Sequence, residues 1–199
     1  MNTNVENLTR NFYKIQVKLS GLFLDVLGGG LNNGVLVGQW QDSGLDNQKW
    51  LLVPIPDEDN TTYYIKAKHS GCSLDVLGGG LNNGVHVGQW VWNHKDNQKW
   101  ILESLDSNYW KIKAKHSGLY LDVLGGGLNN GVSVGQWTKS GLDNQVWRLI
   151  PVESIDIPNV PANIPSSSFE PKMTSKKNAR PSSGRRDWSR VDFVPFRRR

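Results

Sequence analysis

The sequence predicts an all-β fold in which three similar units of four short strands close into a barrel with pseudo-threefold symmetry. The string LDVLGGGLNNGV begins at Leu24, Leu74 and Leu121, at intervals of 50 and 47 residues. Each copy leads into V-G-Q-W and then into D-N-Q-x-W. Self-similarity at a fixed period of this length is typical of proteins built from structural repeats. Apolar and polar residues alternate with period two, and helical periodicity is missing.

The first repeat shows the expected order of the strands. Residues 13–18 alternate apolar and polar side chains, and residues 23–26 form a second short strand after a Ser-Gly turn. The stretch rich in glycine and asparagine that follows predicts a loop, because both residue types accept positive φ angles. Residues 35–40 and 49–53 make the third and fourth strands, separated by a loop whose sequence differs between repeats.

The other two repeats give the same pattern, so twelve strands are expected. One unit alone cannot bury its apolar face, whereas three units that close on one another can, and closure also removes exposed sheet edges. The predicted core consists of the apolar positions that recur in register. These are Ile15, Ile65, Ile112, Leu24, Leu74, Leu121, Val26, Val76, Val123, Val37, Val87, Val134, Trp50, Trp100 and Trp147.

Changes of composition along the chain predict the domain boundaries. A short leader, residues 1–11, precedes the repeat region, residues 12–150. A linker rich in proline and serine, residues 151–170, and a basic tail, residues 171–199, follow it. The three repeats themselves are expected at residues 12–54, 63–103 and 109–150.

The net positive charge of the chain lies in its C-terminal part. Residues 1–150 contain 13 Lys+Arg and 13 Asp+Glu, whereas residues 151–199 contain 10 and 5. In residues 171–199 the basic side chains are interleaved with Trp188, Phe193 and Phe196. This mixture favours an anionic partner such as a nucleic acid, an acidic lipid or an acidic protein. The alternative is a solubilising or localisation tail without fixed structure.

Catalytic and metal-binding patterns are missing from the sequence. Cys72 is the single cysteine, which excludes an intramolecular disulfide and a CxxC motif. The four histidines are dispersed, and no G-x-S-x-G, HExxH or P-loop occurs. We therefore expect a protein that is not an enzyme, with no cofactor and no metal. The paired carboxylates of a glycosidase are the alternative that the sequence leaves open.

The N-terminal residues and the hydropathy pattern bear on localisation. Residues 1–10 lack the apolar segment of a secretory signal, and no apolar run approaches the ~20 residues of a membrane helix. The expected location is the cytoplasm, or outside the cell after export without a cleaved signal peptide.

The motifs L-D-V, N-G-x-x-V-x-x-W and N-Q-x-W, each present three times in register, resemble those of the ricin B-type lectins. The resemblance covers residues 12–150 and implies a β-trefoil fold. In that family the tryptophan of Q-x-W lies in the core and the glutamine braces the neighbouring loops. The resemblance assigns these structural roles to Gln48, Trp50, Gln98, Trp100, Gln145 and Trp147.

The resemblance also implies up to three sugar-binding sites, one in each repeat. The family pocket uses the L-D-V aspartate, an aromatic residue on the next strand and the asparagine before Q-x-W. A carboxylate accepts strong hydrogen bonds from hydroxyl groups, an amide both donates and accepts, and an indole face packs against a pyranose ring. The glycine after L-D-V-L lets backbone N–H groups approach a ligand. The candidate carbohydrate-binding residues are Asp25, Gly28, Trp40, Asn47, Asp75, Gly78, Trp90, Asn97, Asp122, Gly125, Trp137 and Asn144.

Some positions differ from the family pattern or between the repeats. Gly38, Gly88 and Gly135 stand where many relatives carry a glutamine, and the adjacent Gln39, Gln89 and Gln136 are expected on the opposite face of the strand. The glycine–asparagine loop is identical in all copies, which favours a functional loop. The bulky residues Trp92, Asn93 and His94 are expected at the rim of the second site.

Two functions are consistent with these features. The first is a non-enzymatic lectin with shallow sites for galactose or N-acetylgalactosamine, whose weak sites act together through avidity. The second is an assembly protein in which the trefoil is a scaffold and the tail, residues 171–199, binds an anionic partner. At residue level the alternative is that the three aspartates and first tryptophans are structural. The sequence does not determine the oligomeric state.

Overall fold

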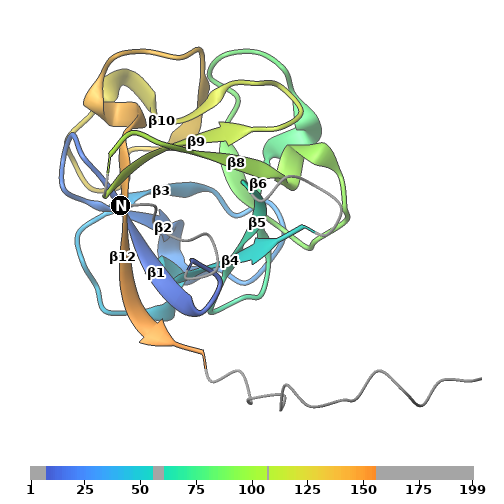
Figure 1. Ribbon diagram of the computed structural model, residues 1–199, viewed down its shortest axis with the longest axis vertical. Helices are drawn as coiled ribbons and strands as arrows, with labels where there is room; N and C mark the ends of the chain where they lie inside the picture. Colours follow the sequence, from blue (N-terminus) through green and yellow to red (C-terminus); the bar gives the residue numbers. More distant parts are fainter. Residues whose placement is uncertain (1–7, 56–60, 107, 156–199) are drawn as a thin grey trace, which may run out of the picture. The chain divides into compact units, whose positions relative to one another are not determined.

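The computed structural model of the chain describes residues 8–55, 61–106 and 108–155, and within them the fold is all-β. The twelve described strands confirm the expected number, four in each repeat (Figure 1). None of these residues forms a helix of the length and hydrophobicity that a membrane crossing requires. The strands are β1 (Asn11–Val17), β2 (Phe23–Val26), β3 (Val37–Trp40), β4 (Trp50–Pro54), β5 (Thr62–Ala67), β6 (Ser73–Val76), β7 (Val87–Trp90), β8 (Trp100–Ser104), β9 (Tyr109–Ala114), β10 (Tyr120–Val123), β11 (Val134–Trp137) and β12 (Trp147–Ser154).

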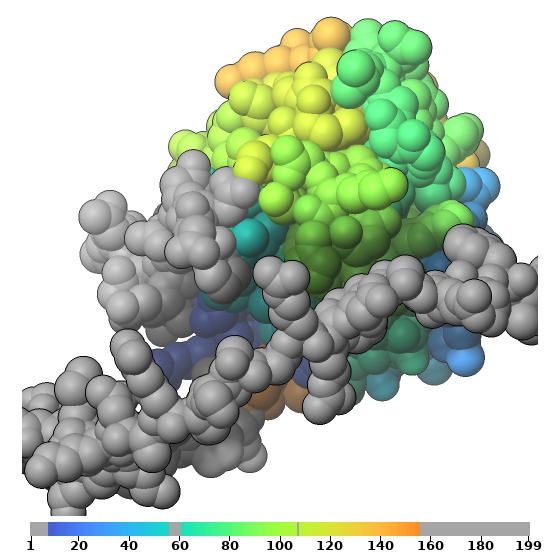
Figure 2. Space-filling view, turned by 90° about the vertical axis from the view of Figure 1, so that its right-hand side faces the viewer, coloured from blue at the N-terminus to red at the C-terminus, as the bar shows by residue number. Residues whose placement is uncertain are grey.

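Strand pairing closes the three repeats into a β-trefoil. The first and fourth strands of each repeat pair with each other and with those of the next repeat, in the closed order β1-β4-β5-β8-β9-β12-β1. The second and third strands form the hairpins β2–β3, β6–β7 and β10–β11. Figure 2 shows the green second repeat against the yellow-green start of the third, as the pairing of β8 with β9 requires.

The core is the predicted one. All fifteen apolar residues expected there are completely buried. The three core tryptophans also make a directional contact, because Trp50 Nε1 donates to Leu24 O at 3.0 Å and Trp100 and Trp147 repeat this bond. Each core indole therefore ties the fourth strand of its repeat to the L-D-V strand, which carries the candidate aspartate.

The hairpins meet closely where the three repeats converge. A Cβ atom at Gly38 would lie 2.8 Å from Val132 O of the third repeat, and Gly88 and Gly135 are as tightly enclosed by Val35 O and Val85 O. No side chain fits at this approach of two backbones. The glycines that depart from the family pattern are therefore required by the packing of the repeats.

The identical glycine–asparagine loops also have a structural explanation. Gln39 is buried, and its Nε2 donates to Gly127 O and Asn129 O of the third repeat at 2.8 and 3.0 Å. Gln89 and Gln136 bind the loops of the other repeats in the same way. The loop therefore receives the buried glutamine of the next repeat. This packing is a structural reason for the identity of the loop, beside the functional one that the sequence predicts. The glutamines are buried and lie on the opposite face of the strand from the exposed tryptophans, as predicted.

The described fold extends past the expected boundary at residue 150. Strand β12 continues to Ser154, and Pro151, which has no N–H to donate, lies opposite Tyr13 next to a bulge in β12 at Val152. Ile155 N then donates to Arg10 O at 2.8 Å. Residues 151–155 thus belong to the fold and not to the linker, and Asn11 belongs to β1 and not to the leader. The remaining linker and the tail, residues 156–199, lie outside the described residues.

Candidate functional site

Each repeat brings its four candidate residues together at the outer side of its hairpin. In the first repeat Asp25 lies on β2, Trp40 ends β3 and Asn47 lies in the 3-10 turn Asp46–Gln48. Gly28 lies in the turn Leu27–Gly29 at φ 69°, in the left-handed region that glycine favours. The second and third repeats place their equivalents in the same elements. We call these groups the first, second and third sites.

The aspartate of each site is buried and held by amide groups. Asp25 Oδ2 accepts hydrogen bonds from Asn47 Nδ2 at 3.0 Å and from Gln48 Nε2 at 2.8 Å. Asp122 Oδ2 accepts the same two bonds from Asn144 and Gln145. Within the described residues the other oxygen of each carboxylate, Oδ1, accepts no hydrogen bond. The carboxylate is therefore fixed in orientation with one acceptor oxygen left over.

The glutamine of Q-x-W connects this carboxylate to the variable loop. Gln48 Nε2 also donates to Gln41 O at 2.8 Å, and Gln48 Oε1 accepts from Ser43 N at 2.9 Å. The same bonds recur at Gln98 and Gln145. The bracing role that the family resemblance implied is thus present in the geometry.

Burial raises the pKa of all three site aspartates. It is the largest influence on Asp25, Asp75 and Asp122, and hydrogen bonds from the adjacent amides oppose it. The effect is largest in the second site, where the pKa of Asp75 is raised to about 6. A carboxyl group with such a pKa changes its charge in a mildly acidic solution.

A second acceptor lies beside the carboxylate in the first and third sites. Asn47 Oδ1 and Asn144 Oδ1 are buried and accept no hydrogen bond from the described residues. Leaving a buried acceptor unsatisfied costs about 1–3 kcal/mol, so such atoms call for a partner. Two hydroxyl groups of a ligand could donate, one to this amide oxygen and the other to the carboxylate.

The two tryptophans of each repeat have opposite surroundings. Trp50, Trp100 and Trp147 are fully buried, whereas Trp40, Trp90 and Trp137 are 40, 40 and 43% exposed. Each exposed indole is backed by a glycine of another repeat, as Trp40 Cζ3 is by Gly131. A supported and accessible ring face of this kind suits stacking against an apolar ring surface.

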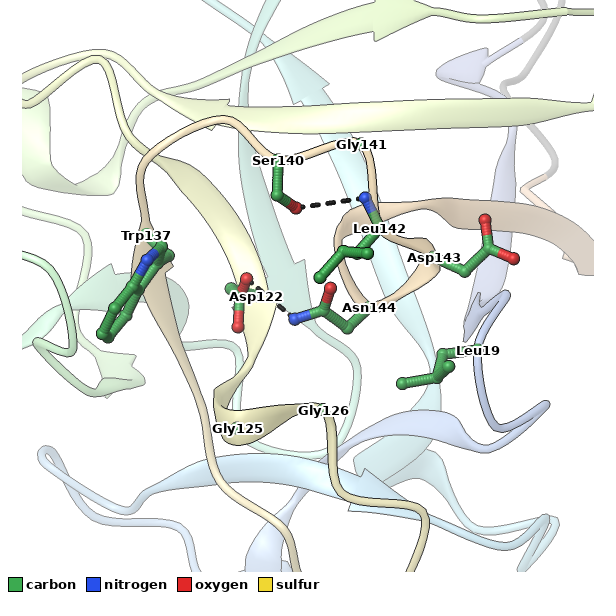
Figure 3. A pocket seen from close by; sticks show the side chains of 10 residues that line it. All are labelled: Leu19, Asp122, Gly125, Gly126, Trp137, Ser140, Gly141, Leu142, Asp143 and Asn144. Carbon is green, nitrogen blue, oxygen red and sulfur yellow. Dashed lines mark hydrogen bonds between the residues drawn. The ribbon is translucent and has the colours of Figure 1, made fainter.

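Cavities in the second and third sites contain all four candidate residues. Asp75, Gly78, Trp90 and Asn97 line a cavity of about 260 Å³, together with Gly79, Asn93 and Lys95. Asp122, Gly125, Trp137 and Asn144 line one of about 680 Å³. Figure 3 shows Asp122 and Asn144 between Trp137 on one side and Leu142 and Leu19 on the other. The wall of this cavity is completed by Gly126, Ser140, Gly141 and Asp143.

The variable loops are anchored by different residues at one position of the first strand. Lys14 Nζ binds Asp42 Oδ1 at 2.6 Å in the first repeat. The equivalent Tyr64 stacks on Trp92 at 4.4 Å between ring centroids. Trp92 and His94 are therefore absent from the lining of the second cavity, which has Asn93 and Lys95 in their place. The prediction that all three bulky residues form this rim holds for Asn93 alone.

In the third repeat the same position is occupied by Lys111. Its buried Nζ donates to Ser140 O at 2.7 Å and so holds the loop that borders the third cavity. Burial and the nearby Lys139 lower the pKa of Lys111. A residue of the first strand thus holds the variable loop of each repeat in position, by an ion pair in the first repeat, an aromatic stack in the second and a hydrogen bond to a carbonyl in the third.

All three repeats contribute to the third site. The third site uses its own Asp122, while Asn83 Oδ1 of the second repeat accepts from Thr138 N at 2.9 Å, next to Trp137. Leu19 of the first repeat completes its other end. His69 and His116 are the residues equivalent to Leu19 in the other repeats and contact Gly30 O and Gly80 O, and His116 is not part of the lining of the second cavity.

Leu19 was not among the predicted site residues. The position is separated from Asp122 by more than a hundred residues, so motif spacing within a repeat does not reveal it. A comparison of the repeats could have found it, because the first repeat reads K-L-S-G at this turn and the other two read K-H-S-G. Lys95 was also not among the predicted site residues, and the same comparison could have found it, because the equivalent residues of the other repeats are Leu45 and Leu142.

The class of protein is shown by comparison with known families. The chain belongs to the family described as ricin-type beta-trefoil lectin domain-like, whose model matches residues 4–90 and 96–163. Among solved structures it is similar to the designed threefold-symmetric protein ThreeFoil, with 40% identity over 71% of this chain and 99% of that chain, at a TM-score of 0.68. No curated protein sequence matches the chain.

Two natural proteins share the architecture. An exo-beta-1,3-galactanase from Clostridium thermocellum is 33% identical, and the match covers 71% of this chain but 30% of that enzyme, with a TM-score of 0.68. The agglutinin of Rhizoctonia solani is 21% identical over 72% of this chain and 96% of its own, with a TM-score of 0.65. At this identity the second similarity shows the fold alone.

Proposed function

We propose that the protein is a non-enzymatic carbohydrate-binding lectin with up to three sites for galactose- or N-acetylgalactosamine-type glycans. The observation that carries the proposal is the grouping in each site of an oriented carboxylate and an accessible indole. In the third site Asp122, Asn144 and Trp137 line one cavity. These groups match a pyranose, which presents hydroxyl donors at its edge and C–H groups on its face.

The sites are expected to be weak individually. The second and third cavities are open to solvent on one side, and a single shallow sugar site binds on the order of mM. Several sites on one rigid domain gain strength through simultaneous contact with a multivalent surface. Galactose is the natural first sugar to test, since a relative that matches at 33% identity is a galactanase, although the chain spans 30% of that enzyme.

The experiment is a titration with galactose, N-acetylgalactosamine and lactose, followed by tryptophan fluorescence and calorimetry. The decisive variant replaces Asp25, Asp75 and Asp122 together by Asn. An amide keeps an acceptor for the bracing glutamine, as at Gln48 Nε2, but presents a donor in place of the outer oxygen. We expect affinity to fall at least tenfold, because hydrogen bonds to charged groups contribute about 1.5–3 kcal/mol.

A matched control makes the same change of net charge away from the sites. The triple variant Glu103→Gln, Asp106→Asn and Glu153→Gln removes three carboxylates that lie on β8, directly after β8 and on β12, and none of them lines a described cavity. Its sugar affinity should equal that of the unchanged protein. Unaltered binding in the Asp25, Asp75 and Asp122 variant would contradict the site assignment, and a blank result on a broad glycan array would contradict the lectin function.

The alternative function as an assembly protein is tested by truncation after Ile155. The described fold ends there, so sugar binding should survive the truncation. Loss of sugar binding in the truncated chain would instead show that residues 156–199 take part in it. Binding to a nucleic acid or to an acidic protein, measured on both forms, reports on the tail itself.

A further inference from the structure

The end of each site opposite the exposed tryptophan differs between the repeats. This end is formed by the residue before D-N-Q, which is Leu45, Lys95 or Leu142, and by a residue after the first strand of another repeat. At these two positions the first site has Leu45 and His69, and the second has Lys95 and His116, of which Lys95 lines the second cavity. The third combines Leu142 with Leu19, and both leucines line its cavity. The third site therefore differs from the others in chemistry as well as in volume.

Leu19 is held against the third repeat by its neighbour in the chain. Lys18 N donates to Val146 O at 2.8 Å, and Lys18 Nζ pairs with Asp143 Oδ1 at 3.0 Å. A Cβ atom at Gly126 would lie 3.8 Å from Leu19 Cδ2, which places the leucine methyl groups against the glycine turn of the cavity. Leu19 is thus a fixed part of the wall, although 38% of its surface is exposed.

The equivalent histidines are engaged differently. The ring Nε2 of His69 lies 3.1 Å from Gly30 O, and that of His116 lies 3.1 Å from Gly80 O. Because a carbonyl oxygen only accepts, Nε2 carries the proton in both residues. Leucine has no donor for the corresponding carbonyl of Gly127 and presents methyl groups instead.

We propose that Leu19 and Leu142 make the third site selective for sugars that carry an apolar substituent, such as an aryl aglycone or an acyl group. The inference rests on the proposed lectin function. A pyranose held by Asp122 and Asn144 and stacked on Trp137 has its far end towards the two leucines (Figure 3). A hydroxyl group there loses water without gaining a partner, whereas an apolar group gains from burial.

The size of the third cavity agrees with this assignment. At about 680 Å³ it exceeds the 260 Å³ of the second cavity and has room beyond a single hexose ring. In the second site Lys95 lies at the corresponding end and presents an ammonium group to the ligand. An apolar substituent would there displace water from a charged group, so the second site should lack the preference.

The test compares phenyl β-galactoside with methyl β-galactoside by calorimetry in a protein with one working site. Trp40→Ala and Trp90→Ala remove the exposed stacking surfaces of the first and second sites. In this background we expect phenyl β-galactoside to bind about five- to tenfold more tightly than the methyl glycoside, because its phenyl ring is buried against two leucine side chains. Leu19→His should reduce this preference to less than about twofold, where the preference is the ratio of the two affinities measured on the same variant.

Two further variants separate a local effect from a general one. Leu105→His changes an exposed leucine that lines neither described cavity and should keep the full preference. Lys95→Leu together with His116→Leu, in a protein with Trp40→Ala and Trp137→Ala, gives the second site the two leucines of the third and should raise its preference. A phenyl preference that persists in Leu19→His would overturn the inference while the lectin function stands. Failure of the unmodified chain to bind any sugar would overturn the lectin function and the inference with it.

Discussion

The aspartates of the three candidate sites are buried carboxylates held by neighbouring amide groups. Asp25, Asp75 and Asp122 are at most 4% exposed, and each is held by amides alone, without a cation within bonding distance. Burial of a carboxylate in this way raises its pKa, so the ionised form destabilises the folded chain. A sugar hydroxyl that donates to the outer oxygen would offset part of that destabilisation.

The second site should lose affinity in mildly acidic solution. The pKa of Asp75 is raised to about 6, so the carboxylate that accepts from the sugar becomes protonated as the pH falls through that value. With the other sites disabled by Trp40→Ala and Trp137→Ala, we expect affinity to be about tenfold lower at pH 5 than at pH 7.5. Calorimetric titration at several pH values checks this, and an affinity independent of pH would contradict it.

Stability should change with pH in the opposite direction. The pKa of Asp75 is about 6 in the folded chain, against an ordinary value of 3.8 for an aspartate, so the folded state holds the proton more tightly than the unfolded chain. The contribution to stability is therefore full below pH 4 and is lost as the pH rises through 6, by about 3 kcal/mol at most. Urea unfolding of the unchanged protein and of Asp75→Asn at pH 4.5 and 7.5 measures this. If the difference in the free energy of unfolding between the two proteins were the same at both pH values, the raised pKa of Asp75 would be refuted.

The hairpins are the elements whose packing the sequence pattern explains least. Alternation and turn residues predicted β2, β6 and β10 well, because these strands depend on local signals. Strand β3 begins at Val37 and not at Val35, because Val35 and Leu36 contact the hairpin of the second repeat instead. The enclosure of Gly38 by a carbonyl of another repeat depends on the closed fold and leaves no local signal.

Two glycine substitutions separate close packing from general intolerance. Gly38→Ala would place a methyl group 2.8 Å from Val132 O and about 3 Å from Leu27, so we expect a loss of about 1–3 kcal/mol. Gly141→Ala meets nothing within 4 Å and lies outside the left-handed region, so its effect should stay within about 0.5 kcal/mol. The free energy of unfolding in urea gives both values. Equal stability of the two variants would show that the hairpins can separate to accept a side chain.

At the scale of the whole molecule, the three repeats share one core and one closed ring of strands. The third site takes its carboxylate from its own repeat, the glycine behind its tryptophan from the second repeat and its far wall from the first. The carboxylate and tryptophan could be predicted from motifs, since they recur in register. The far wall could not, because Leu19 and the third site are far apart in sequence and meet through the closure of the barrel.

A two-repeat fragment should therefore neither fold nor bind. In residues 8–105, β1 lacks its partner β12 and β8 lacks its partner β9, which leaves two long strand edges and an open core. We expect no cooperative thermal transition by near-ultraviolet circular dichroism and no response to galactosides. A cooperative transition in this fragment, against that of residues 8–155 as the control, would show that closure is not required.

The pairing of β1 with β12 along seven residues of β1, from Asn11 to Val17, has a consequence for the order in which the strands are encoded. The beginning and the end of the trefoil lie side by side, and the joins between repeats on the ring are equivalent in geometry. A gene that starts at β5 or at β9, with the original ends joined by a short linker, would encode the same closed ring with the same three sites. Circular permutation thus leaves the binding surface in place, and a fusion partner could be attached at any of the three joins.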